Sequence, residues 1–295
     1  MRLTRTLTAG VVAGALLLAA CSSGSDGPAG EDAATGPTTS AAPTTTTAPG
    51  PTPSAGCGAT PVAAPGTTDE TIVVDGNEGR YQLLVPEGYD GTTPLPLVFG
   101  LHALTVSYTF VPAGAGFPEM QEQYDFIGVS PSNLVDNGTS FWMAAPVPDN
   151  PDVAFMEALL DELEADLCID TSKVFSTGQS NGAQMSSLLA CQVSDRITAV
   201  APIAGVEFPA DPAVCDDRPV PVMAFHGTAD PIVTYEGGGL NAATIANLHY
   251  WHGEAPDDVP AHEGVDTAMD NWAAHNGCEP GREEAGQDVA AAAGR

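Results

Sequence analysis

Basic side chains are scarce in this chain of 295 residues. It has 8 Lys and Arg residues against 38 Asp and Glu residues, so its formal net charge is −30 at pH 7. Lys173 is the only lysine. So strong a negative field opposes binding to nucleic acid or to an anionic lipid surface. We therefore expect no nucleic-acid partner, and we interpret the charge as a source of solubility outside the cell.

Metal-binding patterns are also absent from the sequence. It has no C-x-x-C pair and no His/Cys cluster with the spacing of zinc ligands. We therefore expect no structural metal and no cofactor. The chain has 6 cysteines, which in an exported protein are expected to form disulfides. If Cys21 is modified, an odd number remains, and the sequence alone leaves the connectivity open.

The apolar run at residues 11–20 is too short to span a bilayer. It follows Arg2 and Arg5 and ends in Leu-Ala-Ala before Cys21, which resembles the lipobox of bacterial lipoproteins. The resemblance implies that residues 1–20 are a signal peptide, cleaved before Cys21, and that lipid is attached to the Cys21 thiol. The lipid would anchor the protein on the outer face of the membrane without spanning it. Ordinary secretion, with Cys21 incidental, is the alternative.

A second N-terminal segment lacks large apolar side chains. Residues 22–56 are mainly Ser, Gly, Ala, Pro and Thr. Such a segment cannot bury enough apolar surface to offset the entropy lost on ordering. We predict a disordered tether over residues 21–56 and one folded domain over residues 57–295.

Strand-like and helix-like segments alternate along the predicted domain. Short apolar or β-branched runs predict strands at residues 71–75, 81–85, 95–102, 125–129, 174–177, 197–204 and 220–226. Helical periodicity or helix-forming composition predicts helices at residues 152–167, 181–191 and 266–276. This order predicts an α/β fold with a mainly parallel central sheet and helices on both of its faces.

The most informative pattern is Gly178-Gln179-Ser180-Asn181-Gly182, which we call the elbow. It stands between a predicted strand and a predicted helix, the context of a G-x-S-x-G nucleophile elbow. Such a turn lifts the Ser180 hydroxyl above the sheet, and a Cβ at Gly178 or Gly182 would collide with a neighbouring element. The helix that starts here directs free N–H groups, the Asn181 amide first, at a developing oxyanion. A tight glycine turn without catalysis is the alternative.

An acidic partner for Ser180 is expected later in the chain, followed by a histidine. Asp230 follows the strand predicted at residues 220–226, in the loop at its C-terminal end, where α/β active sites gather. Its carboxylate could orient an imidazole and stabilise the charged form of that ring. An Asp-Pro turn is the alternative. We interpret His226, at the end of the same strand, as a structural histidine hydrogen-bonded beneath the loop.

The loop after residues 95–102 offers a second oxyanion donor, the backbone N–H of Leu104. An ordinary exit from the strand is the alternative. The catalytic histidine is harder to place. His249, His252, His262 and His275 follow Asp230, and none of them follows a strand-like run, as the histidine of this architecture should.

Several segments together resemble the exported esterase family that includes polyhydroxybutyrate depolymerases and bacterial feruloyl and acetylxylan esterases. They cover about residues 56–278, and they are Gly56-Cys57-Gly58, residues 96–102, Leu167-Cys168-Ile169-Asp170, residues 177–183, Leu189-Ala190-Cys191, residues 225–230 and Asn276-Gly277-Cys278. The resemblance implies an α/β-hydrolase fold and a Ser-Asp-His ester hydrolase, with Ser180 as nucleophile and Asp230 as acid. It also implies two disulfides, Cys57–Cys168 and Cys191–Cys215.

The chain departs from the family pattern in two places. His102-Ala103 stands where the family usually has His-Gly. The family places its catalytic histidine after the Asn-Gly-Cys element, beyond a last strand, whereas residues 281–295 have no strand signal and no histidine. Cys278 would also lack a partner under the family's disulfide pairing. We therefore expect that the last strand and the catalytic histidine are missing, through C-terminal truncation or a frame shift after about Gly281.

The resemblance implies an exported serine carboxylic-ester hydrolase that forms an acyl-enzyme. A surface-tethered enzyme suits polymer-linked esters, of the polyhydroxybutyrate or the feruloyl or acetyl xylan type. Trp142 could wall an aromatic or sugar pocket, or it could be a core residue. The alternative function is that of an inactive lipoprotein of the same fold that binds a ligand or an envelope partner. A solute-binding lipoprotein of a transporter is a further alternative, and it would have two similar α/β lobes joined by a hinge. The single elbow and the single predicted sheet argue against it.

Overall fold

The computed structural model describes residues 50–59, 64–134, 140–239 and 261–278, together with the backbone of residues 14–19. Cys21, most of the predicted tether, His249, His252 and the segment after Cys278 lie outside the described residues. Within the described ranges, no helix is both long enough and apolar enough to cross a membrane.

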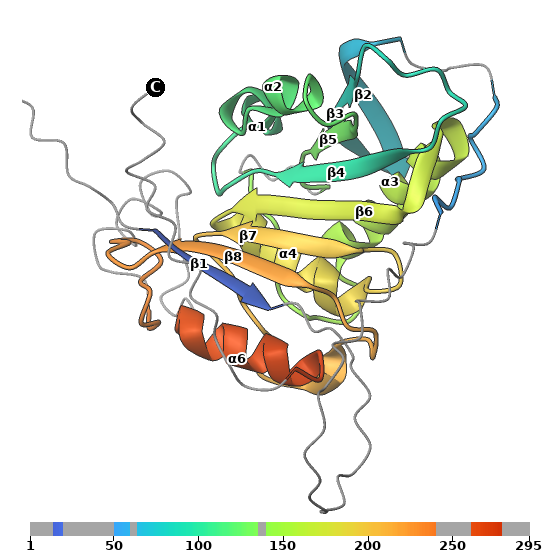
Figure 1. Ribbon diagram of the computed structural model, residues 1–295. Coiled ribbons are helices and arrows are strands. Elements are labelled where there is room, and N and C mark those ends of the chain that lie inside the picture. Colours follow the sequence, from blue (N-terminus) through green and yellow to red (C-terminus); the bar gives the residue numbers. More distant parts are fainter. Residues whose placement is uncertain (1–13, 20–49, 60–63, 135–139, 240–260, 279–295) are drawn as a thin grey trace, which may run out of the picture.

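One mixed sheet runs through the described residues (Figure 1). Its strands are β1 (Gly14–Ala19), β2 (Gly66–Val74), β3 (Asn77–Val85), β4 (Leu95–Leu101), β5 (Ile127–Pro131), β6 (Ile169–Gln179), β7 (Ala199–Ile203) and β8 (Val222–Gly227). They lie in the order β1-β8-β7-β6-β4-β5-β3-β2. The strands β5, β4, β6, β7 and β8 are parallel, whereas β1, β2 and β3 pair antiparallel. The predicted, mainly parallel sheet is confirmed.

The strands expected from the apolar pattern are all found, and the differences lie at their ends. The largest difference is in β6, predicted at residues 174–177 and observed over Ile169–Gln179. The added residues include the polar run Asp170-Thr171-Ser172-Lys173, which carries no apolar signal. This run is held by bonds to a distant N-terminal segment, which a local pattern cannot show.

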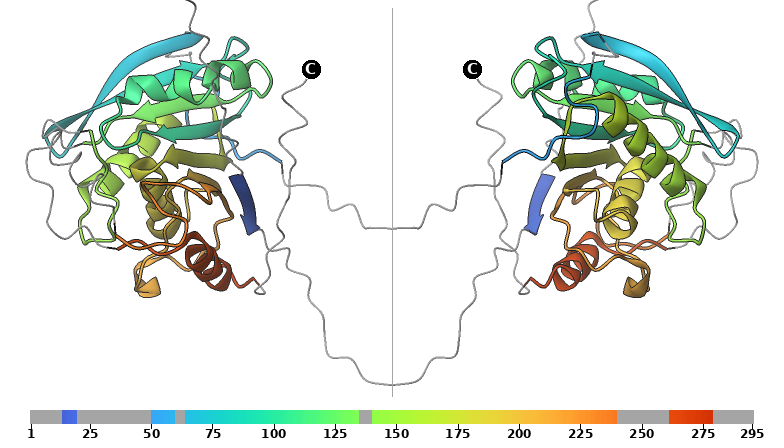
Figure 2. Two further views of the ribbon diagram at one scale, coloured as in Figure 1. Left: turned by 90° about the vertical axis from the view of Figure 1, so that its left-hand side faces the viewer. Right: turned by 90° about the vertical axis from the view of Figure 1, so that its right-hand side faces the viewer.

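Helices cover both faces of the sheet (Figures 1 and 2). One face carries α1 (Val111–Gly114) and α2 (Phe117–Gln121). Both come after the short 3-10 helix η1 (Tyr108–Phe110) in the chain. Phe117 packs with Leu84 of β3 and with Val98 of β4. The helices α3 (Pro151–Asp166) and α4 (Asn181–Gln192) bury their side chains in the main core with Leu97 and Phe99 of β4. Successive strand side chains point to opposite faces, so the two groups of helices lie on opposite sides.

At one edge of the sheet, β1 pairs with β8. The helix α6 (Val265–His275) packs near β8 and β1, at the opposite edge from β2 (Figure 1). The 3-10 turn η2 (Pro212–Val214) precedes β8. The strand β1 is antiparallel to β8, with Gly14 opposite Gly227 and Ala19 opposite Val222. This edge strand comes from the segment predicted to be an export signal.

The packed domain begins before the boundary predicted at residue 57. The Ser54 hydroxyl donates to the Leu167 carbonyl at 2.6 Å and accepts from the Ile169 amide at 2.9 Å. Ser54 is buried, and the Thr52 amide donates to Asp170 Oδ1 at 2.9 Å. Ser54 thus satisfies buried backbone groups at and just before the start of β6, and Thr52 bonds a buried carboxylate, although their composition predicted a disordered tether. The structure therefore moves the start of the domain to about residue 52.

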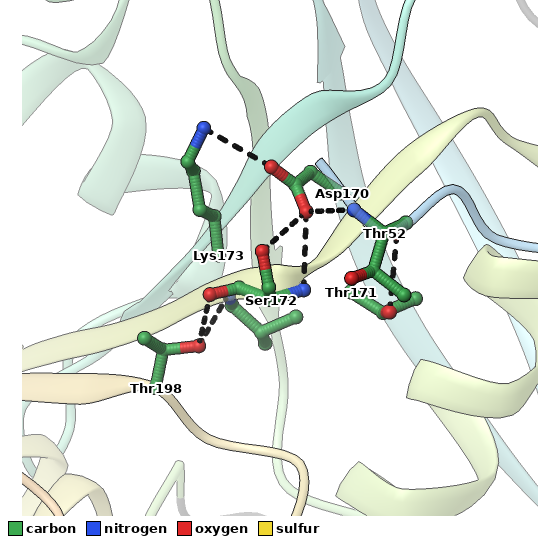
Figure 3. Close-up of polar contacts among 7 residues, drawn as sticks. Thr52, Asp170, Thr171, Ser172, Lys173 and Thr198 are labelled. Carbon is green, nitrogen blue, oxygen red and sulfur yellow. Dashed lines mark hydrogen bonds and ion pairs between the residues drawn. The ribbon is translucent and has the colours of Figure 1, made fainter. Parts of the chain in front are cut away.

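Asp170 is the centre of this attachment (Figure 3). Its carboxylate is fully buried, at 0% exposed. Oδ1 accepts from the Thr52 amide and from the Ser172 hydroxyl at 2.6 Å, and Oδ2 lies 3.0 Å from the Lys173 ammonium. Burial acts to raise the pKa of Asp170, but the bonds from Ser172, Thr52 and Lys173 outweigh it, and the pKa is lowered. The only lysine of the chain thus neutralises a buried acid.

Both disulfides implied by the family resemblance are present. Cys57–Cys168 ties the N-terminal segment to the start of β6, and Cys191–Cys215 ties α4 to the loop after β7. Cys278 is also disulfide-bonded, which corrects the expectation that it would lack a partner. That expectation was one reason to infer a missing C-terminal strand, so the inference loses this support.

Candidate functional site

The elbow lies where β6 turns sharply into α4. Ser180, between them, has φ 54° and ψ −118°, a region that a non-glycine residue adopts only under strain. Its amide donates to the Ile203 carbonyl of β7 at 2.9 Å. A Cβ at Gly178 would lie 2.5 Å from the Gly182 backbone, and one at Gly182 would lie 2.3 Å from the Leu101 carbonyl oxygen. The close approach of β4, β6 and α4 therefore requires both glycines.

The loop after β7 packs directly against the elbow. A Cβ at Gly205 would lie 2.5 Å from the Ser180 carbonyl oxygen. Ala204, before it, has φ 53°, which places a second strained residue beside Ser180. Farther along the loop, Glu207 Oε1 accepts a hydrogen bond from Gln184 Nε2 of α4 at 2.7 Å. Sequence reasoning missed Gln184 and Glu207, because neither belongs to a local motif.

Two backbone amides near Ser180 are candidates for oxyanion binding. Asn181 is the first residue of α4, where N–H groups have no acceptor within the helix. Leu104 lies in the loop after β4, and its amide makes no hydrogen bond to any described residue. Thr105, next to it, has φ 65° and donates its amide to the Ser140 carbonyl at 2.7 Å. The Thr105 bond therefore fixes the loop, while the Leu104 amide donates to no described residue.

Residues 140–143, which we call the bridge, connect these two candidate donors. Asn181 Oδ1 accepts from the Trp142 amide at 2.6 Å, and Asn181 Nδ2 donates to the Trp142 carbonyl at 3.0 Å. The Trp142 indole Nε1 donates to the His102 carbonyl at 3.1 Å, and the two rings stack with centroids 4.9 Å apart. One side of the bridge thus holds α4, and the other holds the loop that carries Leu104.

Trp142 does not line an open pocket. It is 1% exposed and belongs to the main core. This geometry gives no support to the substrate contact predicted for it, because neither face of the ring is open to solvent. The structure favours the other role considered for Trp142, that of a core residue.

Two buried polar side chains at the start of α3 anchor the bridge. Asp152 accepts from the Leu134 amide at 2.9 Å and from the Met143 amide at 2.8 Å. Asn150 donates to the Met143 carbonyl at 2.6 Å and to the Ala145 carbonyl at 2.9 Å. Burial raises the pKa of Asp152, and the two accepted bonds offset part of that effect. Sequence reasoning missed both residues, although Asn-Pro-Asp is a recognisable start of a helix.

Asp230 lies in the loop after β8, where the sequence placed it. Its Oδ1 accepts from the Ile232 amide at 2.8 Å and from the Val233 amide at 3.1 Å, so it closes its own turn. Its Oδ2 lies 3.9 Å from His226 Nε2. That nitrogen also lies 2.7 Å from the Val233 carbonyl oxygen, and His226 is buried. His226 is thus a structural histidine beneath the loop, as expected.

The other described histidines after Asp230 contact different groups. His262 Nε2 lies 3.1 Å from the Thr234 carbonyl oxygen. His275, in the last turn of α6, packs edge-on to Trp272. Within the described ranges, no histidine is hydrogen-bonded to Asp230, and no group of three His, Cys, Asp or Glu side chains is arranged to hold a metal ion.

Known proteins resemble this chain over most of its folded part. It is 32% identical to feruloyl esterase C of Emericella nidulans over 213 aligned residues. The aligned residues make up 70% of this chain and 72% of the relative. It is also 32% identical to the probable feruloyl esterase C of Aspergillus niger over 192 aligned residues. This alignment spans 63% of this chain and 65% of that relative's length, which is less than two thirds. A solved thermostable esterase superposes with a TM-score of 0.48 and 19% identity, covering 63% of this chain and 52% of its own. No protein-family model matches the chain.

A mainly parallel sheet with helices on both faces, and a strained serine between a strand and a helix, is the architecture of an α/β-hydrolase. The chain belongs to the feruloyl esterase family of α/β-hydrolases.

Proposed function

We propose that this protein is a serine carboxylic-ester hydrolase in which Ser180 is the nucleophile. The observation that carries the proposal is the strained backbone of Ser180 between β6 and α4, with φ 54°. Ligand binding alone does not require such strain. In a nucleophile elbow, the strained turn exposes the serine hydroxyl and places the N-terminus of the following helix beside it. The feruloyl esterases among the relatives support ester chemistry.

In the proposed reaction, the Ser180 hydroxyl attacks the carbonyl carbon of the ester while a histidine takes its proton. The amides of Asn181 and Leu104 bind the oxyanion of the tetrahedral intermediate, and each such donor stabilises the transition state by about 3 kcal/mol. The bond to the alcohol then breaks, and the alcohol leaves with the proton from the histidine. Water, activated by the same histidine, releases the acid from the acyl-enzyme.

Asp230 is the proposed acid that orients the histidine and stabilises its charged form. The free oxygen for this role is Oδ2, because Oδ1 accepts from Ile232 and Val233. His262 and His275 make other contacts, so His249 and His252 are the first candidates for the base within this chain.

We further infer that the protein is exported and acts on polymer-linked esters. Two disulfides support an oxidising compartment outside the cytosol. The relatives favour feruloyl esters over polyhydroxybutyrate as the substrate class.

The test is hydrolysis of methyl ferulate and p-nitrophenyl butyrate by the full chain. We expect turnover that falls by about 10⁴-fold or more in Ser180→Ala. Ser107→Ala, which removes an exposed hydroxyl bonded to Thr109, is the matched control and should leave turnover unchanged. His249→Ala and His252→Ala identify the base, because one of them should match the loss in Ser180→Ala.

A second candidate function is a binding lipoprotein of the same fold without catalysis. It is favoured by one observation, that no described histidine is hydrogen-bonded to Asp230. Tight ester binding with no turnover above that of Ser180→Ala would support it and would contradict the hydrolase.

A further inference from the structure

Most of the described basic side chains lie at the end of the sheet away from Ser180. Lys173 is on β6, seven residues before Ser180, which places it about 23 Å along the strand from the elbow. β7 begins opposite Phe175 of β6, and Arg196 comes three residues before that start. Arg218 donates to two backbone carbonyls in the turn around Arg196. Three of the four described cations are therefore gathered at the N-terminal ends of the parallel strands.

The charge of these cations is largely cancelled where they lie. Arg196 Nη1 is 2.8 Å from the carboxylate of Asp161. Arg80, the fourth described cation, is on β3, three places from β6 in the strand order, and its Nε lies 3.2 Å from Glu78. The two opposite charges of an ion pair offset each other at a distance. Little positive potential from these side chains therefore reaches the elbow.

The loops at the Ser180 end of the sheet are acidic. The connections after β4, β5 and β8 are residues 102–126, 132–150 and 228–264, and none of them contains a lysine or an arginine. Residues 228–264 contain six acidic residues, with Asp230 and Glu236 among them. The C-terminal ends of parallel strands meet at one edge of a sheet, so these loops start around the elbow. The three connections bring negative charge to this edge, which we call the acidic edge, and no basic side chain to offset it.

A chain of contacts joins the loop after β8 to the elbow. Glu236 is exposed and follows Tyr235, whose ring packs edge-on to that of His226 with centroids 5.9 Å apart. His226 immediately follows the β8 residue that pairs with Ile203 of β7. The Ile203 carbonyl accepts from the Ser180 amide at 2.9 Å. The charge of Glu236 is thus held at the level of the nucleophile, on the second strand along from β6.

Charges at this separation act on a substrate without touching it. β8 lies two strand spacings from β6, or about 10 Å, whereas Lys173 lies about 23 Å from the elbow. The screening length is about 30 Å in 0.01 M salt and about 3 Å in 1 M salt, so the field of the acidic edge reaches Ser180 only at low ionic strength. A face with one sign of charge changes the association rate of a charged ligand by about 10-fold or more.

We propose that the acidic edge selects neutral and cationic esters over anionic ones and expels the anionic acid that hydrolysis produces. This inference rests on the proposed function and names the substrate class by its charge. Hydrolysis converts a neutral ester into an alcohol and a carboxylic acid, and the acid is ionised at neutral pH, so the product meets a repulsion that the ester does not. Among polymer-linked esters, the enzyme should prefer those on uncharged chains to those with acidic groups beside the ester.

The test compares two esters of ferulic acid that have the same size and differ by one charge, the carboxymethyl ester and the carbamoylmethyl ester. The full chain is assayed at about pH 8, where an unperturbed histidine is neutral. In about 0.01 M salt we expect kcat/KM to be about 10-fold lower for the anionic carboxymethyl ester, and in about 0.5 M salt about 2-fold lower or less. The cationic choline ester should show the opposite trend, with kcat/KM falling as salt is added. Inhibition by ferulate should strengthen about 5-fold over the same range of salt.

Two charge reversals separate the acidic edge from the net charge of the protein. Glu236→Lys and Asp217→Lys make the same change of charge at exposed positions, but Glu236 follows β8 and Asp217 precedes it. Glu236→Lys should reduce the 10-fold preference to about 3-fold, whereas Asp217→Lys should leave it close to 10-fold. If a reversal does not fold, as judged by circular dichroism, Glu236→Gln and Asp217→Asn give the same comparison with about half the effect.

Equal kcat/KM values for the two matched esters in low salt, or a preference that salt does not change, would overturn the inference. Equal effects of the two reversals would also overturn it, because they would assign the preference to the net charge of the whole protein. In each of these cases, turnover of the carbamoylmethyl ester shows that the hydrolase stands. If neither ester is hydrolysed faster than by Ser180→Ala, the proposed function fails, and the inference fails with it.

Discussion

The side chain of Asn181 holds the backbone of Trp142 on both sides, accepting from its amide at 2.6 Å and donating to its carbonyl at 3.0 Å. The Trp142 indole continues this connection to the His102 carbonyl, at the start of the loop that carries Leu104. The two proposed oxyanion donors come from α4 and from the loop after β4, which are far apart in sequence. The bridge therefore sets the distance between them.

This relationship predicts that Asn181→Ala lowers kcat for methyl ferulate by about 10- to 100-fold with little change in KM. The variant keeps its own backbone amide, so the loss would report misplacement of the donors rather than removal of one. Asn271→Ala, an equivalent substitution on α6, should leave kcat unchanged. An unchanged kcat in Asn181→Ala would show that the bridge does not position the donors.

The attachment at Asp170 predicts a large difference between two neighbouring substitutions. Asp170→Ala leaves the Thr52 amide, the Ser172 amide and the Lys173 ammonium without a partner, and it should lower the free energy of unfolding by about 3 kcal/mol. Lys173→Met removes a side chain that is 51% exposed, and it should cost less than about 1 kcal/mol. Urea unfolding of both variants measures the difference. Equal losses would show that the ion pair, rather than the buried carboxylate, holds the segment.

The pH dependence of the same site has a defined sign. The pKa of Asp170 is lower in the folded state than in the unfolded chain, so its contribution to stability is present above the ordinary pKa of an aspartate. That contribution is lost as the pH falls through the lowered pKa. The difference in unfolding free energy between the wild type and Asp170→Asn should therefore shrink on acidification. A constant difference would mean that ionisation of Asp170 is not what stabilises the segment.

The elbow could be predicted because its constraints are local. Gly178, Ser180 and Gly182 lie within five residues, and a strand signal and a helix signal flank them. The sheet could be predicted for a similar reason, because its buried parallel strands are continuous apolar runs. The disulfides came from the family resemblance, since the cysteines alone left the pairing open.

The remainder of the site depends on contacts between distant residues. Asp152 and Glu207 are ordinary acids in a chain with 38 of them, and nothing local marks them as buried. Ser54 and Thr52 have the composition of a linker, yet the Ser54 hydroxyl accepts from the Ile169 amide and the Thr52 carbonyl accepts from the Thr171 amide, both in β6. Burial of a polar residue is set by its partners, and these lie more than a hundred residues away in the case of Thr52 and Asp170.

Residues 14–19 have two competing assignments, an export signal and the edge strand β1 paired with β8. We expect the exported protein to be cleaved before Cys21, which would remove β1 and leave one side of β8 without a partner. Amides of β8 that face β1 should then exchange hydrogen faster in the exported protein than in the full chain. Intact mass and hydrogen exchange measure both effects. An exported protein that keeps residues 14–19 would assign them to the sheet instead.

Glu207 predicts a pH dependence of the opposite sign. Burial raises its pKa in the folded state, so the folded protein binds a proton more readily than the unfolded chain between the ordinary and the raised value. Stability should therefore fall as the pH rises through that interval. Glu207→Gln keeps an acceptor for Gln184 and removes the titration, so it should gain stability relative to the wild type as the pH rises. Glu263 and His262, which also act on Glu207, remain in both proteins and cancel in the comparison. Urea unfolding of the two proteins from about pH 4 to about pH 8, which brackets a raised carboxyl pKa, measures the difference. A difference that does not change with pH would show that Glu207 ionises as freely in the folded protein as in the unfolded chain.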